Sequence, residues 1–298
     1  MADERDFAIL SHLRKDPFMS YENLGRAVWL SGRAVKTRLE ALEKNKILTS
    51  LQAVPAAQVF RRQPRLFFFE RRASPEKLNG AVELDPVVFA TVDVNRSAAV
   101  LLYHRPGAPV LPRRLGALLG GASSEATPLY PHPRRELAKP VPLAELKVLR
   151  MLVLDLRIPL REISEATGLT QRVAKKARRR LVDDGLLQVQ PIFQSARSSG
   201  ILMYELHVHS SEPSVLSRLR EGVPRSMFVN QWESGAIILS CWADSIQEVY
   251  EVEARLRREP GVGGVQVKFH ARTVLATRRL SSWIDEEISQ SENGRLSD

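Results

Sequence analysis

The sequence contains a long internal repeat, and this feature limits the possible folds more than any other. When the chain is compared with itself at an offset of 139 positions, residues 6–50 lie over residues 145–189 without a gap. A repeat of this kind predicts two copies of one structural unit, each with its own small core. The coinciding positions include Leu13 with Leu152, Leu24 with Ile163, Ser31 with Thr170, and Arg33 with Arg172.

Each copy has the pattern of three short helices. In the first copy, residues 6–14 carry apolar side chains at helical spacing. Ser20 and Ser31 are placed to cap the second and third helices, and the third is predicted over residues 32–44. Two helices joined by a tight turn, the second of them basic, form the helix-turn-helix pattern. The second copy repeats this with Gly168 at the turn, Thr170 as the cap, a third helix over 171–183, and Gly185 just past its end.

Strands are predicted directly after each helical copy. Residues 47–54 are expected to pair with residues 58–61, and residues 186–193 with the segment after Ser199. Such hairpins would serve as wings. The sequence therefore predicts two winged helix-turn-helix units.

The third helix of the second copy carries six cations within residues 172–180. Like charges at this spacing repel one another unless an anion covers them, although a solvated basic face balanced by nearby carboxylates is the simpler alternative. The whole chain has a formal net charge of +10, which favours a polyanionic partner. We therefore expect the third helices to contact double-stranded DNA. The predicted contact residues are Ser31, Arg33, Lys36, Thr37, Arg38, Thr170, Arg172, Lys175, Lys176 and Arg179.

Each helical copy is followed by strands and helices that predict an α+β domain. The order strand, helix, strand, strand, helix, strand is that of the ferredoxin-like βαββαβ unit. In the second half these elements are expected at 201–208, 213–220, 227–233, 236–242, 245–257 and 264–271. The predicted domains are winged helix-turn-helix units at 1–62 and 143–197, ferredoxin-like effector domains at 63–131 and 198–290, a linker at 132–142, and a flexible tail at 291–298.

The segment from Leu24 through the Leu30-Ser31 turn and the basic helix to Glu43 resembles the leucine-responsive regulator / AsnC (Lrp/AsnC) family of transcription factors. The resemblance implies winged helix-turn-helix units followed by ferredoxin-like domains. It also implies dimeric DNA binding, modulation by a small-molecule effector, and a homodimer formed through the effector domains. A tandem chain would resemble a covalently fused dimer.

The resemblance further implies an effector loop before the third strand of the second half. Family members usually carry Gly and Asp at three-residue spacing there, whereas the matching positions in this chain are Trp232 and Gly235. The predicted effector-binding residues are Trp232, Ser234 and Gly235.

No Gly-rich phosphate loop or nucleophile elbow is found in the sequence, so no catalytic residue, cofactor or metal is predicted. His207 and His209 alternate along a predicted strand and could supply two metal ligands, but two strand histidines without a metal are the simpler interpretation. Two alternative functions are a sirohaem decarboxylase of similar architecture and an RNA-binding or scaffold protein. The absence of a secretory pattern and of an apolar run near ~20 residues predicts a cytoplasmic protein that does not cross a membrane.

Overall fold

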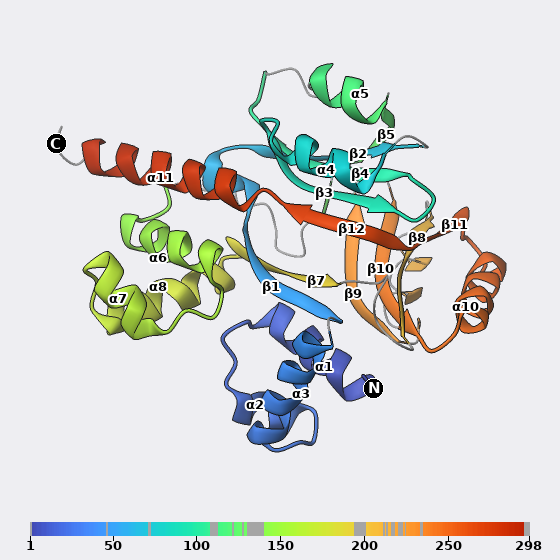
Figure 1. The fold of residues 1–298 in the computed structure, drawn as a ribbon, viewed down its shortest axis with the longest axis horizontal. Coiled ribbons are helices and arrows are strands. Elements are labelled where there is room, and N and C mark those ends of the chain that lie inside the picture. The colour runs from blue at the N-terminus through green and yellow to red at the C-terminus, as the bar shows by residue number, and fades with distance from the viewer. Residues whose placement is uncertain are drawn as a thin grey trace.

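The computed structural model describes residues 2–45, 47–70, 73–107, 113–120, 122–126, 128–129, 140–193, 201–210, 212, 214–215, 218–219, 223, 225–232 and 235–294. These residues form two three-helix units, a two-stranded ribbon and two five-stranded sheets (Figure 1). The helical units lie along the ribbon on one side of the molecule. None of the described helices is both long and apolar enough to cross a lipid bilayer.

The two helical units have the same succession of elements. The third helices occupy the predicted residues, and the first helix starts earlier than predicted because Asp3 caps it and accepts hydrogen bonds from the backbone amides of Arg5 and Asp6. Gly185 follows α8 with a φ of 66°, as expected of a residue that ends a helix. The units are α1 (Glu4–Lys15), α2 (Tyr21–Ala27) and α3 (Gly32–Lys44), then α6 (Leu143–Leu154), α7 (Leu160–Thr167) and α8 (Gln171–Asp183).

The strands after the helical units do not form the predicted wings. Strand β1 (Leu48–Pro55) pairs with β7 (Leu187–Phe193) of the other half as an antiparallel ribbon. Residues 58–61 cannot pair with β1, because η1 (Ala57–Phe60) is a 3₁₀ helix that buries Val59 and Phe60 in the core around α6. The seven residues of β7 pair with β1 from Leu48 to Pro55, which the four residues 58–61 could not do, and the wing prediction was wrong for this reason.

The first sheet has the strand order β12-β3-β4-β2-β5. Helices α4 (Pro75–Val82) and α5 (Arg113–Leu119) cover one face of it, where Leu78 and Leu115 pack against the fully buried Val100 and Leu102. Its strands are β2 (Gln63–Phe69), β3 (Val87–Asp93), β4 (Ala98–His104), β5 (Ala122–Ala126) and β12 (His270–Leu275).

The second sheet has the corresponding order β11-β8-β10-β9-β6. Helix α10 (Ile246–Arg258) covers one face, where Val249 and Leu256 pack against Leu206 and Leu239. Of the predicted helix at 213–220, only residues 214–215 and 218–219 lie within the described residues. Its strands are β6 (Pro128–Leu129), β8 (Leu202–His209), β9 (Ser226–Trp232), β10 (Ala236–Ala243) and β11 (Gly264–Lys268).

Each half of the chain adds an outer strand to the sheet of the other half. Strand β6 of the first half pairs with β9, and β12 of the second half pairs with β3. The strand predicted over 264–271 is therefore two strands that meet at Phe269 and belong to different sheets. After β12, α11 (Thr277–Gly294) packs along α6 and continues into the segment predicted as a flexible tail.

The sheets also contact each other through the faces opposite to α4, α5 and α10. Leu66, Phe68 and Leu101 of the first sheet meet Ala236 and Ile238 of the second. The α1–α3 unit packs on the second sheet, against Met203, Met227 and Trp242. The two halves are thus interlocked by packing as well as by the exchanged strands.

The offset of 139 positions extends from the helical units into the sheets. Leu66 pairs with Leu101 across β2 and β4, and the residues at the same offset, Glu205 and Ser240, pair across β8 and β10. Such agreement of strand register is what a repeated unit predicts.

Candidate nucleic-acid interface

The first turns of α3 carry the exposed residues of this helix that were predicted to contact DNA. The Ser31 hydroxyl accepts a hydrogen bond from the Ala34 backbone amide at 3.1 Å, which fixes the start of the helix. Arg33, Lys36 and Thr37 then project into solvent. These predicted contact residues are available to a partner that approaches the first turns of α3.

Arg38 is the exception among the predicted contact residues of α3. Its guanidinium donates to Asp3 and to the buried Asp6, at 3.0 Å in each case, and so joins α3 to α1. The hydrogen bond that Arg38 donates to Asp6 raises the pKa of Arg38, and the bond to Asp3 acts in the same direction. Arg38 therefore stabilises the helical unit rather than extending its exposed basic surface.

Helix α8 carries the densest exposed charge at this surface. The Thr170 hydroxyl accepts from the Val173 backbone amide at 3.3 Å and caps the helix. The buried side of the helix presents Ala174, Ala177 and Leu181 to the core. The exposed side lines an open depression with Arg172, Lys175, Lys176, Arg179 and Arg180.

Two arginines of α8 also reach the first helical unit, at the turn between α1 and α2. The Arg178 guanidinium lies 4.3 Å from the centre of the Phe18 ring, and burial lowers the pKa of this arginine. Arg179 donates to Asp16 at 2.9 Å while its side chain stays 60% exposed. Because Arg157 donates to the Tyr21 hydroxyl nearby, at 2.6 Å, the two helical units are fixed to each other.

Residues 3–43 match the model of the AsnC-type helix-turn-helix domain. The first helical unit of the chain is thus similar to an AsnC-type helix-turn-helix domain. Comparison with curated proteins gave no match.

Among solved structures, one with a fold similar to the whole chain is the siroheme decarboxylase NirDL. It is 13% identical, covers 96% of this chain and 99% of its own, and has a TM-score of 0.52. An AsnC family transcriptional regulator from Agrobacterium tumefaciens is 18% identical and covers 48% of this chain and 97% of its own, with a TM-score of 0.31. Escherichia coli AsnC is 18% identical and covers 43% and 90%, with a TM-score of 0.30.

The AsnC-type domain contains one residue that the sequence prediction did not single out. Trp29, in the turn between α2 and α3, is 88% exposed and has a φ of 58°. The residue at the 139-position offset is Gly168, whose φ is 70°. The repeat alignment contained the signal, because it places a tryptophan opposite a glycine at a helix-helix turn.

The predicted effector residues lie at the β9–β10 hairpin of the second sheet, outside the AsnC-type domain. Gly235 lies directly before β10 and has a φ of 77°. Trp232 ends β9, and Ser234 lies outside the described residues. Trp242 of β10 belongs to the core: it is 4% exposed and stacks on Phe7 with 4.5 Å between ring centres.

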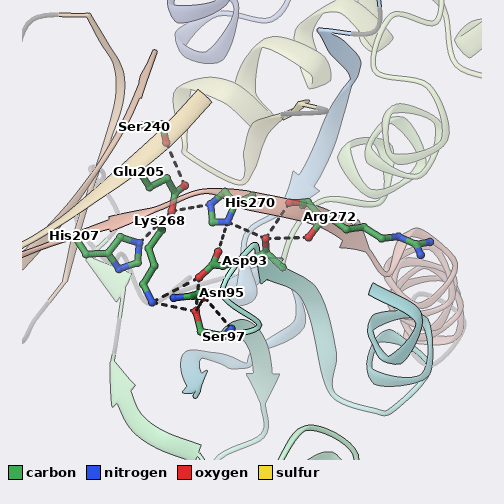
Figure 2. Close-up of polar contacts among 11 residues, drawn as sticks. Asp93, Asn95, Ser97, Glu205, His207, Ser240, Lys268, His270 and Arg272 are labelled. Atoms are coloured by element: carbon green, nitrogen blue, oxygen red, sulfur yellow. Dashed lines mark hydrogen bonds and ion pairs between the residues drawn. The ribbon is translucent and has the colours of Figure 1, made fainter. Parts of the chain in front are cut away.

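A cluster of charged side chains lies where the second sheet meets the β3–β4 hairpin (Figure 2). His270 lies at its centre: its Nε2 is 3.0 Å from Glu205 and its Nδ1 is 2.8 Å from Asp93. His207 reaches the same Glu205 carboxylate at 3.2 Å. Lys268 lies 3.6 Å from Asp93 on the other side. We call these five residues the polar cluster.

The protonation of the polar cluster follows from these contacts. Burial alone would lower the pKa of His270, but Glu205 and Asp93 outweigh it and raise the pKa to about 10. Burial alone would raise the pKa of Glu205, but His270 and His207 hold it well below its usual range. A protonated His270 can donate from both ring nitrogens to the two carboxylates, so the cluster is an internal ion-pair network.

The polar cluster has no counterpart at the matching positions of the first half. Leu66 and Phe68 correspond to Glu205 and His207, and the Phe68 and His207 rings contact each other edge to face at 5.9 Å. The alternating His207 and His209 were considered as metal ligands. Within the described part of the chain, no group of three or more His, Cys, Asp or Glu side chains is arranged to hold a metal ion.

Proposed function

We propose that the chain is a sequence-specific regulator that binds double-stranded DNA through α3 and α8. The observation that carries the proposal is α8, where five cations line one open depression and the opposite side is buried. Like charges at three- and four-residue spacing cost about 0.2–0.5 kcal/mol per pair in a helix. Phosphate groups would remove this repulsion, and the AsnC-type match of residues 3–43 supplies the class of partner.

The fold supports a fused-dimer arrangement of this regulator. Two helical units share one ribbon, two sheets exchange outer strands, and the 139-position offset holds in strand register. We infer a tandem duplication in which each half supplies one helix-turn-helix and one ferredoxin-like domain. One chain then presents both recognition helices, and the sheet faces that a homodimer would use are already packed against each other. A small-molecule effector at the β9–β10 hairpin belongs to the same proposal.

The test compares two variants that lose equal charge. Arg172→Ala/Lys175→Ala/Lys176→Ala removes exposed cations of α8. Arg218→Ala/Arg255→Ala/Arg258→Ala removes two exposed cations of α10 and Arg218, which pairs with Glu259 directly after α10. Helix α10 lies at the end of the molecule away from α8 (Figure 1). Duplex affinity is measured against salt concentration by fluorescence anisotropy.

If the three α8 cations meet phosphates, the log-log salt slope of the α8 variant falls by about 2.7, at about 0.9 per contact. The α10 variant keeps the wild-type slope. Equal losses in both variants would show that binding depends on net charge alone, and would exclude α8 as the contact surface. Far-ultraviolet circular dichroism confirms that both variants are folded.

A second candidate function is supported by one observation, the whole-chain fold likeness to the siroheme decarboxylase NirDL. On this alternative the chain would bind and decarboxylate a similar tetrapyrrole, and the basic surface of α8 would have no partner. Addition of sirohaem to the purified chain tests it by the change in the absorption spectrum and by the mass of the product. Binding without a loss of carbon dioxide would make the tetrapyrrole an effector of the regulator instead of a substrate.

A further inference from the structure

Trp29 combines strong exposure with an unfavourable backbone conformation. Its side chain is 88% exposed, the highest value among the large apolar side chains that the structure describes. Its φ of 58° lies in the left-handed region, where a bulky residue destabilises the folded state relative to glycine. The backbone conformation of Trp29 destabilises the folded state, and its side chain gains no burial in return. A stabilising role therefore does not explain why a tryptophan stands at this position.

The turn itself does not need a tryptophan. Gly168 forms the same turn in the second unit with a φ of 70° and has nothing within 4 Å of an added Cβ atom. In the first unit the backbone fixes the turn, because the Leu30 amide donates to the Gly25 carbonyl at 2.8 Å and a Cβ at Gly25 would lie 2.4 Å from the Leu30 oxygen. Trp29 is therefore added to a turn whose geometry is already determined.

The surroundings of Trp29 are those of the proposed DNA surface. Ser31, two residues later, caps α3, and the exposed Arg33 follows in its first turn. Arg26 is exposed on the preceding helix. In the part of the chain that the structure describes, the indole N–H of Trp29 has no hydrogen-bond partner. An exposed flat ring with an unused donor between two arginines is complementary to a sugar-phosphate strand.

We propose that Trp29 contacts the backbone of the duplex, with its ring packed on a deoxyribose and its indole N–H donating to a phosphate oxygen. This inference rests on the proposed function and assigns the first helical unit an aromatic anchor in place of the dense cations of α8. The contact positions α3 against the double helix without carrying sequence information.

The test uses Trp29→Gly and Trp29→Asn, since both residues tolerate a positive φ. Both variants keep or raise the midpoint of thermal unfolding, and both bind duplex about tenfold more weakly at constant salt, a change equivalent to about 1.4 kcal/mol. The salt slope stays at the wild-type value because no cation is lost. Unchanged affinity in either variant overturns the inference.

Fluorescence supplies a second measurement of the same contact. Of the four tryptophans, Trp242 and Trp283 are buried and Trp29 is exposed, so the difference in emission between the wild type and Trp29→Gly reports on Trp29. Duplex addition quenches part of the wild-type emission, and this part is missing in Trp29→Gly.

The two proposals fail in different ways. If the wild type binds duplex with the expected salt slope and both Trp29 variants bind with the wild-type affinity, only the Trp29 inference is wrong. If the wild type binds no duplex, both are wrong. If Trp29→Gly converts a dimer to a monomer in analytical ultracentrifugation and leaves DNA affinity unchanged, Trp29 contacts a second copy of the chain, and the inference is likewise overturned.

Discussion

Replacement of Glu205 by glutamine tests whether the polar cluster holds the two halves together. Glu205→Gln keeps the shape of the side chain and removes the charge that faces His270 at 3.0 Å and His207 at 3.2 Å. His270 would keep Asp93, 2.8 Å from its Nδ1, as a charged partner. The variant should therefore be less stable than the wild type at pH 7.

The size of the loss follows from the exposure of the pair. Removal of one partner from a fully buried ion pair costs about 3–5 kcal/mol. The side chains of Glu205 and His270 keep 22% and 26% of their surface, so water compensates for part of the lost charge. We expect a decrease of about 2 kcal/mol in the free energy of unfolding.

Urea unfolding followed by tryptophan fluorescence measures the change, with Glu251→Gln as the control because Glu251 is an exposed carboxylate on α10. The control should unfold at the wild-type midpoint. If Glu205→Gln also unfolds there, or at a higher urea concentration, the polar cluster does not stabilise the interlocked halves and the reasoning fails.

Three further predictions concern pH, the contact between helical units, and the AsnC-type turn. The folded pKa of His270 is raised to about 10 from an ordinary 6.5, so its stabilisation is complete below about pH 6.5 and is lost as the pH rises through 10. Urea midpoints should therefore fall over this range in the wild type, and less so in His270→Asn. Asp16→Asn removes one of the two carboxylates that pair with Arg179 and leaves Asp183, so duplex affinity measured by anisotropy rises about two- to fivefold; a decrease would contradict a phosphate contact by Arg179. Gly25→Ala places a Cβ atom 2.4 Å from the Leu30 carbonyl, and calorimetry should show a loss of about 2 kcal/mol, whereas a neutral result would mean that the turn can relax.

Local sequence patterns predicted the helical units well. Helices α3 and α8 have the bounds that the sequence predicted. Each begins after its predicted cap, Ser31 or Thr170, and each carries its own apolar stripe. These signals lie within a few residues of one another, so the sequence alone is enough to place them. Gly168 and Gly185 were placed for the same reason, because a turn that needs a positive φ favours glycine.

Strand pairing could not be predicted in the same way. The pattern of β1 indicates a strand but not its partner, and the pairing with β7 joins residues far apart in the sequence. The exchange of β12 depends on a break at Phe269, where neither glycine nor proline marks an end. Edge strands need backbone partners, and only the assembled fold shows which partner is within reach.

The sequence predicted which residues of the candidate site are exposed better than it predicted which residues contact one another. The exposed positions of Arg172, Lys175 and Lys176 follow from the helical period, which places Ala174 and Ala177 on the buried side. The period cannot show that Arg38 pairs with Asp3 and Asp6, because α1 is distant in the sequence. The polar cluster was missed for the same reason, since its members come from both halves of the chain.

Selection of bound fragments from a random pool of duplex DNA tests the central claim most directly. The account predicts that the full chain enriches a consensus with two half-sites about one helical turn apart, one for α3 and one for α8. Failure to retain any duplex at low ionic strength would contradict it, because the exposed cations of α8 would then have no nucleic-acid partner.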